Sequence, residues 1–578
     1  MNLTNTFIFI LLLAAINLKA QNSYELKVST SDVSQNILNK YKYQNKLNEL
    51  SEAQLIVNNL IREIHNAGYL LARIESNEVV ENQINYYISI GPPFEWMKLS
   101  AGNLDPLLLR KVAYREGNFN QRRFNYRELS KLENSILSYA ENNGYPFASL
   151  NYDSLKIEDQ QISSSLNLNL GPLINYDSLD VKGDVIKRSF LESYLGIQPG
   201  EPYEMDRVQG SVQRINSLPF LRLIGPPEIS YQNEEASISY VFDKRRINTI
   251  DGIIGFLPNS GSNSGLLITG QFDMELYNPF QTGKHIGIHW RSPSQQSQML
   301  HMLYEHPHIF KSPVSFATDF NFLKQDTTFS KLNFNVDVDL QVGASGRMAV
   351  FTEFIESNLL STAQYENATV LPEFADISNT LYGLSFTRQT WDDPILPTRG
   401  MYFFIAVGLG NKTIKRNIDL PDELYAGVDF ESVQYKFDLN SQQFFNLKPR
   451  WNMKIAIDGG WIENDNLFRN DAYRLGGLNS IRGFDENFYF ATRFIKSTFE
   501  NRYFIDSSSY LLLFADFGYL DGFTASESSE PFIGFGTGIS FDTGRGIFNL
   551  VYALGTSKSV GSLDLNRSKI HFGFTTRF

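Results

Sequence analysis

The sequence contains no cysteine, no long apolar run and no excess of positive charge. The missing cysteine excludes disulfides, thiolate metal sites and a lipidated N-terminal cysteine, although an oxidising compartment remains possible. No segment reaches the ~18 unbroken apolar residues of a membrane-spanning helix, which excludes a helical membrane protein. The formal net charge of −12 argues against nucleic acid as a partner, because phosphate binding depends on clustered Lys and Arg.

What is present indicates a folded, multidomain and exported protein. With 578 residues the chain is too long for one domain, and its 42% hydrophobic content is too high for a disordered chain. An apolar run over residues 7–16 has the length of the hydrophobic part of a signal peptide. We therefore expect residues 1–20 to be a signal peptide with Ala20 as its last residue.

The first half of the chain repeats itself. The segment Asn66–Ile74 (NAGYLLARI) recurs as Asn142–Leu150 (NNGYPFASL), and a weaker third copy surrounds Leu218–Leu221 (LPFL). Self-similarity of this kind indicates tandem copies of one structural unit. The sequence therefore predicts three repeated domains, over residues 21–91, 92–171 and 172–243.

Each repeat has the pattern of a small α+β domain. A helical stretch with one apolar face precedes strands of alternating polarity, such as residues 84–90 and 166–170, and Gly68 is a natural helix stop. The predicted helix faces are Ala53, Ile56, Leu60 and Ile64 in the first copy, Leu129, Leu132, Ile136 and Tyr139 in the second, and Met205, Val208, Val212 and Ile215 in the third.

From residue 244 to 578 the helical period disappears and strand alternation takes over. Residues 332–340, 451–458 and 533–541 each place apolar side chains on one face and polar residues or glycine on the other. Alternating segments of ~10 residues are typical of transmembrane β-barrels, and this length would fit 12 to 18 strands. A soluble β-sandwich also alternates, but the expected signal peptide and the aromatic content favour an all-β barrel in the outer membrane.

One connection in the second half is much longer than a hairpin loop. It runs from near Gly460 to near Ile495 and contains the glycine-rich segment Arg474–Phe484 (RLGGLNSIRGF). Two other phrases stand out, Phe514–Gly518 (FADFG) and Asp392–Gly400 (DDPILPTRG).

These motifs resemble those of the outer-membrane assembly factor superfamily that includes BamA, TamA and the two-partner secretion transporters. Ile481–Phe484 is similar to the family's (V/I)RG(F/Y) motif in the sixth barrel loop, and the repeats look like POTRA domains. Phe514–Gly518 resembles the family's FxDxG strand, and the terminal Phe578 its outer-membrane targeting signal. The resemblance implies a 16-stranded antiparallel barrel, and three repeats are closest to the TamA-like members.

The resemblance also implies two sites. In the family the sixth loop folds into the barrel, where its Arg meets the Asp of the FxDxG strand; we expect this pair to act as a latch. The expected latch residues are Arg482, Gly483, Phe484, Phe514, Asp516 and Gly518, with Glu500 and Arg502 as a charge pair in the lumen. The second site is a weakly paired lateral seam between the first and last strands, for which Ile253, Gly573 and Phe578 are the candidates.

The expected function is that of an assembly or translocation factor, not of an enzyme. Clients would be unfolded outer-membrane or secreted proteins, held by the POTRA domains in the periplasm and moved through the seam. Accessory periplasmic or inner-membrane proteins are possible partners, and no cofactor is expected. The alternative is a two-partner-type pore that exports one dedicated polypeptide. His301, Glu305, His306 and His308 could suggest a metal site, but no fourth ordered ligand supports it.

Overall fold

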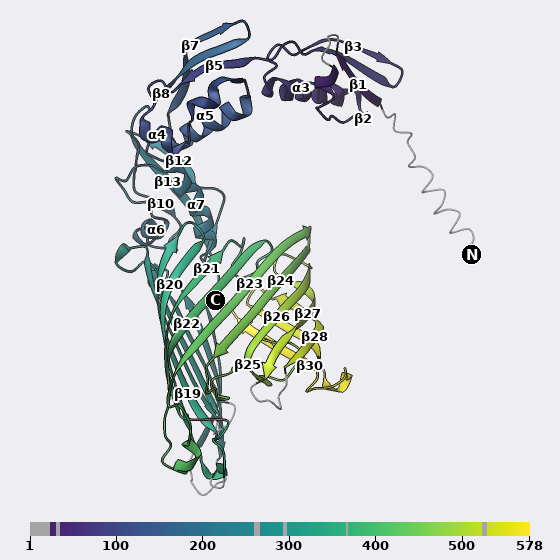
Figure 1. Ribbon diagram of the computed structural model, residues 1–578. Helices are drawn as coiled ribbons and strands as arrows, with labels where there is room; N and C mark the ends of the chain where they lie inside the picture. Colours follow the sequence, from purple (N-terminus) through teal and green to yellow (C-terminus); the bar gives the residue numbers. More distant parts are fainter. Residues whose placement is uncertain (1–23, 31–34, 259–265, 293–296, 366–367, 523–528) are drawn as a thin grey trace, which may run out of the picture. The chain divides into compact units, whose positions relative to one another are not determined.

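The computed structural model describes residues 24–30, 35–258, 266–292, 297–365, 368–522 and 529–578 (Figure 1). The expected signal peptide lies outside these residues. The chain divides into two compact units, Met1–Asn175 with Pro202–Met205, and Tyr176–Glu201 with Asp206–Phe578. No helix in the described ranges is long and apolar enough to cross a membrane.

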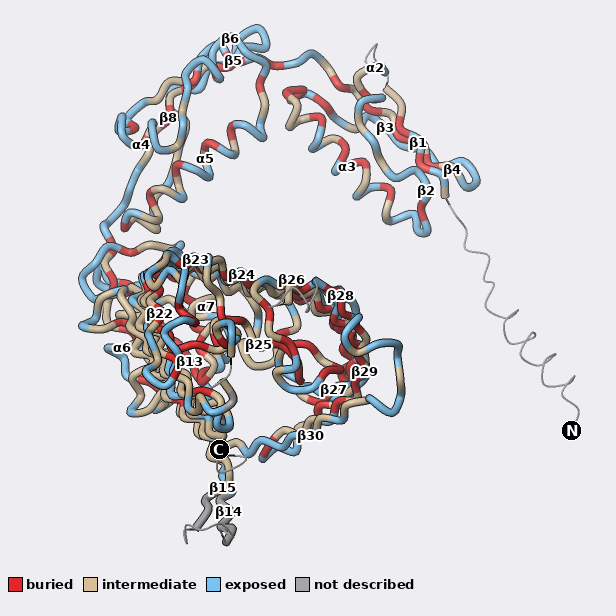
Figure 2. The backbone as a smooth tube through the Cα atoms, turned by 60° about the horizontal axis from the view of Figure 1, so that its bottom comes forward, coloured by how far each residue is buried: buried red, intermediate tan, exposed pale blue. Residues whose placement is uncertain are grey.

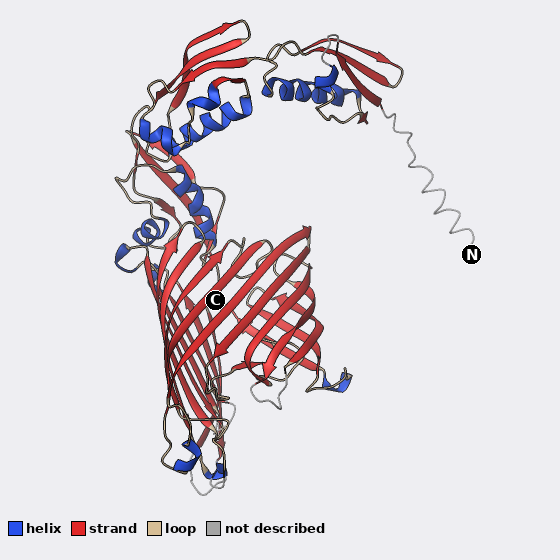
Figure 3. Ribbon diagram, viewed as in Figure 1, coloured by secondary structure: helices blue, strands red, loops and turns tan. Residues whose placement is uncertain are grey.

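The first unit contains two α+β repeats that resemble POTRA domains (Figure 3). In the first repeat a sheet of order β2-β1-β4-β3 packs against helix α3. Of the predicted face, Ala53, Leu60 and Ile64 are buried and Ile56 is half-buried against the same core, and Val57 is buried as well. The elements are β1 (Tyr24–Thr30), α2 (Gln35–Leu38), β2 (Lys46–Leu47), α3 (Leu50–Asn66), β3 (Arg73–Val80) and β4 (Gln83–Ser89).

The second repeat has the same plan, with sheet order β6-β5-β8-β7. Its helix α5 begins after Asn125, whose side chain accepts hydrogen bonds from the backbone N–H groups of Arg127 and Glu128. Of the predicted face, Leu129, Leu132 and Ile136 are buried and Tyr139 is half-buried against the same core, and Ala140 is buried as well. The elements are β5 (Glu95–Ser100), α4 (Pro106–Lys111), η1 (Glu116–Phe119), β6 (Asn120–Arg123), α5 (Tyr126–Glu141), β7 (Ser149–Glu158) and β8 (Gln161–Asn169).

The third repeat belongs to the second unit, together with the barrel. Of the predicted face of its helix α7, Val208 and Ile215 are buried and Met205 and Val212 are half-buried, and Ser211 is buried as well. Ser211 tolerates burial because its hydroxyl accepts a hydrogen bond from the Tyr240 hydroxyl at 2.6 Å. The elements are β9 (Asn175–Tyr176), β10 (Asp180–Lys182), α6 (Arg188–Leu195), α7 (Met205–Asn216), β11 (Leu221–Leu223), β12 (Glu228–Gln232) and β13 (Glu235–Lys244).

The rest of the second unit is an antiparallel barrel. Within the described ranges its sheet has 17 strands; β25 belongs to a connection, so 16 form the wall. In β27, for example, Leu512, Phe514 and Asp516 are buried while Leu511 and Leu513 are exposed, as the alternation predicts. The wall strands are β14 (Thr249–Pro258), β15 (Leu266–Tyr277), β16 (His285–Ser292), β17 (Gln298–His306), β18 (Val314–Gln325), β19 (Phe329–Val342), β20 (Gly346–Leu359), β21 (Ile377–Gln389), β22 (Gly400–Ile414), β23 (Glu431–Lys448), β24 (Trp451–Glu463), β26 (Tyr489–Phe504), β27 (Tyr510–Gly522), β28 (Glu530–Asp542), β29 (Gly546–Ser557) and β30 (Lys569–Thr576).

The barrel is nearly closed. Every pair of successive wall strands forms a hydrogen-bonded ladder in its described residues, but β14 and β30 form none. Among the residues that the structure describes, one backbone hydrogen bond crosses this junction, from the Phe578 N–H to the Asn248 carbonyl at 3.0 Å. The first and last strands therefore meet at a seam that is far less tightly paired than the rest of the wall.

Candidate functional site: an inward-folded loop and a lateral seam

The long connection lies between β24 and β26 and will be called the inner loop (residues 464–488). It is shorter than the sequence suggested, because β24 continues to Glu463 and β26 begins at Tyr489. Its strand β25 (Tyr473–Leu475) pairs antiparallel with β26, Tyr473 lying opposite Ala491. Buried residues gather on the β26–β29 side of the barrel (Figure 2), where the loop's Ile481 and Phe484 also lie.

Arg482 at the tip of the inner loop makes a two-pronged contact with Asp516 of β27. The guanidinium donates from Nε to Oδ2 and from Nη2 to Oδ1, both at 2.7 Å. The Asp516 side chain is 1% exposed and also accepts from the Thr498 hydroxyl at 2.8 Å. An Arg–carboxylate pair in this geometry is directional as well as charged, so it fixes the loop tip against the wall.

Glu500 and Arg502 form the expected charge pair, and Glu500 joins this pair to the Arg482 contact in one network. Glu500 accepts from Arg482 Nη1 at 2.7 Å and from Arg502 Nε at 2.8 Å. The Arg482 guanidinium also lies 3.6 Å from the ring centroid of Phe514. Two cations and two carboxylates thus alternate in a line, which balances their charges in a buried place.

Glycines on β28 and β29 make room for the loop tip. A Cβ added at Gly534 would collide with the Arg482 carbonyl oxygen, and one at Gly555 would stand 2.6 Å from the Gly483 carbonyl oxygen. Gly483 itself has φ +93°, in the region that favours glycine. The loop backbone therefore rests directly on the wall at positions without a side chain.

Apolar packing completes the docking. The Phe484 ring is 2% exposed and lies 5.3 Å from the Tyr489 ring and 6.4 Å from the Phe532 ring. Gly518 leaves space for Phe532, whose Cζ would be 2.8 Å from a Cβ at that position. The structure thus brings together all six expected latch residues, five of them in the loop tip and its direct surroundings, and Gly518 beneath Phe532.

A second anchor holds the beginning of the inner loop. The Lys412 side chain is fully buried; its Nζ donates to the Asn466 carbonyl at 2.6 Å and pairs with Asp471. The buried Asn470 donates to the Ser357 hydroxyl at 2.9 Å and to the Ala375 carbonyl at 2.8 Å. These contacts join the loop to β20, β22 and the segment before β21.

The turn between β21 and β22 connects the barrel to the third repeat. Arg245, just after β13, donates to both carboxylate oxygens of Asp393 at 2.9 and 2.8 Å. Asp393 also accepts from the Ile395 and Leu396 N–H groups, and Asp392 from the Thr398 hydroxyl at 2.6 Å. Burial would raise the pKa of Asp393, but Arg245 and these N–H groups outweigh it and hold the pKa below its usual value.

The seam contains a cavity of about 960 Å³ whose lining includes Ile253, Phe572 and Gly573. Ile253 is 67% exposed and Phe572 69%, and a Cβ added at Gly573 would meet nothing within 4 Å. Phe578 supplies the single recorded backbone bond to Asn248. All three predicted seam residues therefore lie along the open junction.

The histidines that could have suggested a metal site are dispersed among carboxylates instead. His301 contacts Asp319 at 2.6 Å, and His285 contacts Glu275 and Glu305 at 2.5 and 3.4 Å. No group of three His, Asp or Glu suited to a metal ion occurs within the residues that the structure describes.

Sequence reasoning missed several residues of the site. Thr498, which donates to Asp516, gave no sign of its role, since nothing local distinguishes it. Gly534 and Gly555 did leave a signal, because glycine recurs at the inward positions of a strand only where something approaches the backbone closely. The alternation of residues 533–541 predicts a barrel strand but does not by itself predict that the loop backbone rests on its glycines.

Comparison with known proteins gives a consistent assignment. The Omp85 superfamily domain matches residues 278–578. CdiB from Acinetobacter baumannii is similar in structure with a TM-score of 0.55 and 10% identity, over 92% of this chain and 98% of that one. CdiB from Escherichia coli has a TM-score of 0.54 and 12% identity, over 91% and 97%. A BamA structure from Haemophilus ducreyi, lacking POTRA domains 1–3, has a TM-score of 0.41 and 14% identity, over 83% and 99%. No curated protein sequence matches the chain.

Proposed function

Because this chain belongs to the Omp85 superfamily, we propose that it inserts client polypeptides into the outer membrane, or moves them to it, through the lateral seam of its barrel. The observation that carries this proposal is the unpaired junction of β14 and β30. Each strand presents free backbone donors and acceptors there, which a client strand can pair with by β-augmentation. In this proposal the three repeats lie in the periplasm and hold extended clients.

The inner loop supports the seam mechanism. It packs on β26–β29 through Arg482, Phe484 and the glycines, on the C-terminal side of the barrel next to the seam. The contacts of Arg482 stiffen that wall, and the second anchor ties the loop to β20 and β22, so that opening is confined to the edge where pairing is already absent. No step needs a nucleotide, a metal or a catalytic group, and we assign no enzymatic activity.

A reconstitution experiment tests the function. The purified protein is placed in phospholipid vesicles, an unfolded outer-membrane barrel protein is added, and its folding is followed by heat-modifiable migration in gels. We expect faster client folding than in empty vesicles and in vesicles with the Arg482→Ala variant. Client folding at the rate of empty vesicles, with stable conductance in planar bilayers, would instead support the two-partner secretion pore.

A further inference from the structure

Two turns at the same end of the barrel adopt the same backbone conformation. The first, residues 278–282, joins β15 to β16 around η2 (Pro279–Gln281), and the second, residues 308–312, joins β17 to β18 around η3 (Ile309–Lys311). Positive φ angles recur at equivalent places: Asn278 58° and His308 52°, Phe280 60° and Phe310 52°, Gln281 60° and Lys311 59°. Each turn also ends on a hydroxyl that donates to the backbone carbonyl three residues before it. The Thr282 hydroxyl donates to the Pro279 carbonyl at 2.9 Å, and the Ser312 hydroxyl to the Ile309 carbonyl at 2.7 Å.

Both turns place a phenylalanine at the same position, and both rings project into the surroundings. Phe280 is 82% exposed and Phe310 is 98% exposed, although each has the left-handed backbone that glycine adopts without strain. A bulky aromatic residue is thus held in a strained conformation with little packing inside the protein. Folding of the turn does not explain the choice of Phe, which indicates a partner outside the chain.

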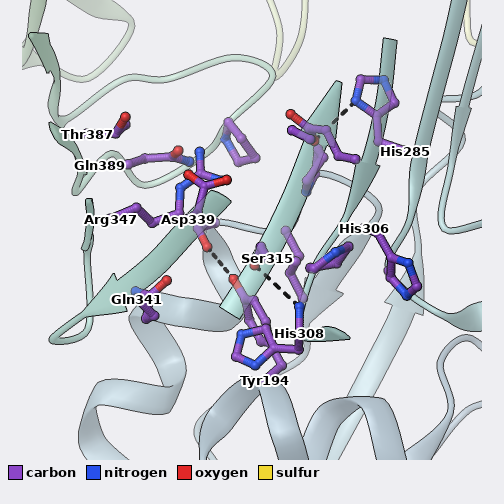
Figure 4. A pocket seen from close by; sticks show the side chains of 18 of the residues that line it. Tyr194, His285, His306, His308, Ser315, Asp339, Gln341, Arg347, Thr387 and Gln389 are labelled. Carbon is purple, nitrogen blue, oxygen red and sulfur yellow. Dashed lines mark hydrogen bonds and ion pairs between the residues drawn. The ribbon is translucent and has the colours of Figure 1, made fainter. Parts of the chain in front are cut away.

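The third repeat contacts both turns through hydrogen bonds and an aromatic ring contact. Asn278 Nδ2 donates to the Val185 carbonyl at 2.7 Å, and the Lys187 N–H donates to the Gln281 carbonyl at 3.1 Å. On α6, the Tyr194 ring lies 5.2 Å from the His308 ring, and the two side chains stand next to one another in Figure 4. The turns are therefore fixed on the third repeat, and their phenylalanines extend away from a rigid base.

The environment of the two rings is that of a bilayer interface. The outer rows of the adjoining strands are mostly apolar: Ile286, Ile288 and Trp290 on β16, Leu300, Met302 and Tyr304 on β17, and Phe316, Thr318, Phe320 and Phe322 on β18. Three exposed cations lie in the same part of the chain: Lys311 in the second turn, and Lys187 and Arg188 at the start of α6. Aromatic rings beside cations at the end of an apolar wall match the boundary between acyl chains and phosphates.

We propose that Phe280 and Phe310 are a paired membrane anchor, inserted at the headgroup level of the phospholipid leaflet that borders the repeats. The neighbouring cations would contact lipid phosphates, and α6 would be held at the membrane surface through its contacts with both turns. This inference depends on the barrel spanning a bilayer and goes beyond the client function, since it involves neither the seam nor the inner loop.

Site-directed spin labelling tests the anchor, and the absence of native cysteine allows single labels. Phe280→Cys and Phe310→Cys carry a nitroxide, and the protein is placed in vesicles of phosphatidylethanolamine and phosphatidylglycerol. Ile418→Cys is the matched control, because Ile418 is 96% exposed and lies in the β22–β23 connection, at the opposite end of the barrel. We expect the labels at 280 and 310 to collide about tenfold less with an aqueous nickel chelate than the label at 418, and more with oxygen.

Heat-modifiable migration verifies that each variant has folded. Should one fail, Gln281→Cys and Lys311→Cys place the label one residue further along the same turns. Nickel accessibility equal to that at position 418 at both turns would overturn the anchor. Protection that appears only after soluble periplasmic protein is added would also overturn it and assign the turns to a protein partner. Failure of client folding would leave the collision result unchanged, so this test is separate from that of the proposed function.

Discussion

The guanidinium of Arg482 spans both carboxylate oxygens of Asp516 at 2.7 Å while its third nitrogen reaches Glu500 at the same distance. Asp516 and Glu500 are 1% and 7% exposed. Arg482 is therefore the cation that two buried carboxylates share. Its removal takes an ion-pair partner from both carboxylates and leaves Asp516 with none in this network, whereas removal of one carboxylate leaves Arg482 paired with the other.

The first prediction follows from that asymmetry. Arg482→Ala should lower the free energy of unfolding by roughly 3–5 kcal/mol, and Asp516→Ala by less, because Arg482 retains Glu500 in the second variant. The double variant should be no worse than Arg482→Ala alone. Urea unfolding in detergent micelles measures this. Arg493→Ala, which removes an exposed pair with Glu463, is the control and should change little. Additive losses in the double variant would contradict a shared latch.

A second prediction concerns the glycine beneath the loop tip. Gly534→Val should displace the tip, because a Cβ there collides with the Arg482 carbonyl oxygen, which belongs to backbone and cannot swing aside. The barrel should still assemble, but limited proteolysis should cut the inner loop. Gly459→Val is the control, since a Cβ there meets its nearest atom at an ordinary 3.4 Å. Equal protease resistance in both variants would refute the tight docking.

The barrel, and which side chains of its strands face the lumen, were predictable from the sequence. The contacts of the inner loop were only partly predictable. Alternation assigns Phe514 to the lumen because strand geometry is local and has a period of two. The partnership of Lys412 with Asp471 is not local, since it joins β22 to the inner loop and no pattern connects the two positions. The helix faces were predictable only in outline for a similar reason: that Val57 is fully buried and Ile56 only half-buried depends on the sheet that the helix meets.

The buried pair of Lys412 and Asp471 leads to a third prediction. Lys412→Met should destabilise the protein by about 3 kcal/mol, because it leaves the Asp471 carboxylate, 3% exposed, without its cation. Adding Asp471→Leu should restore much of the loss by removing the stranded charge. Thermal unfolding of both variants is the measurement. Arg416→Met, from an exposed pair with Asp422, is the matched control. A double variant as unstable as the single one would show that the charge is not the cause.

The fourth prediction is a pH dependence at the contact between the third repeat and the barrel. Asp393 has a lowered pKa in the folded protein, so its ionised form stabilises the fold above the unfolded pKa of about 4, and this contribution disappears as pH falls below it. Wild type should therefore exceed Asp393→Asn in thermal stability at pH 7, and the difference should shrink below about pH 4. A difference that is constant down to pH 3 would contradict the role of the charge.

The last prediction tests the seam, using the chain's lack of cysteine. The bond between Phe578 and Asn248 sets a register that, continued along the strands, places Ile253 opposite Gly573 rather than Phe572. Ile253→Cys with Gly573→Cys should therefore crosslink more readily than Ile253→Cys with Phe572→Cys, because disulfides require Cα atoms within about 7 Å.

The crosslinked seam should stop client folding without unfolding the barrel, and reduction should restore it. The control is a disulfide between Leu511→Cys and Ile539→Cys, direct partners on the paired strands β27 and β28, which should leave activity intact. A secretion pore that works only through its lumen would tolerate both locks, since neither changes the lumen. Full client assembly by the oxidised seam variant would therefore exclude lateral opening and favour the secretion pore as the function of this chain.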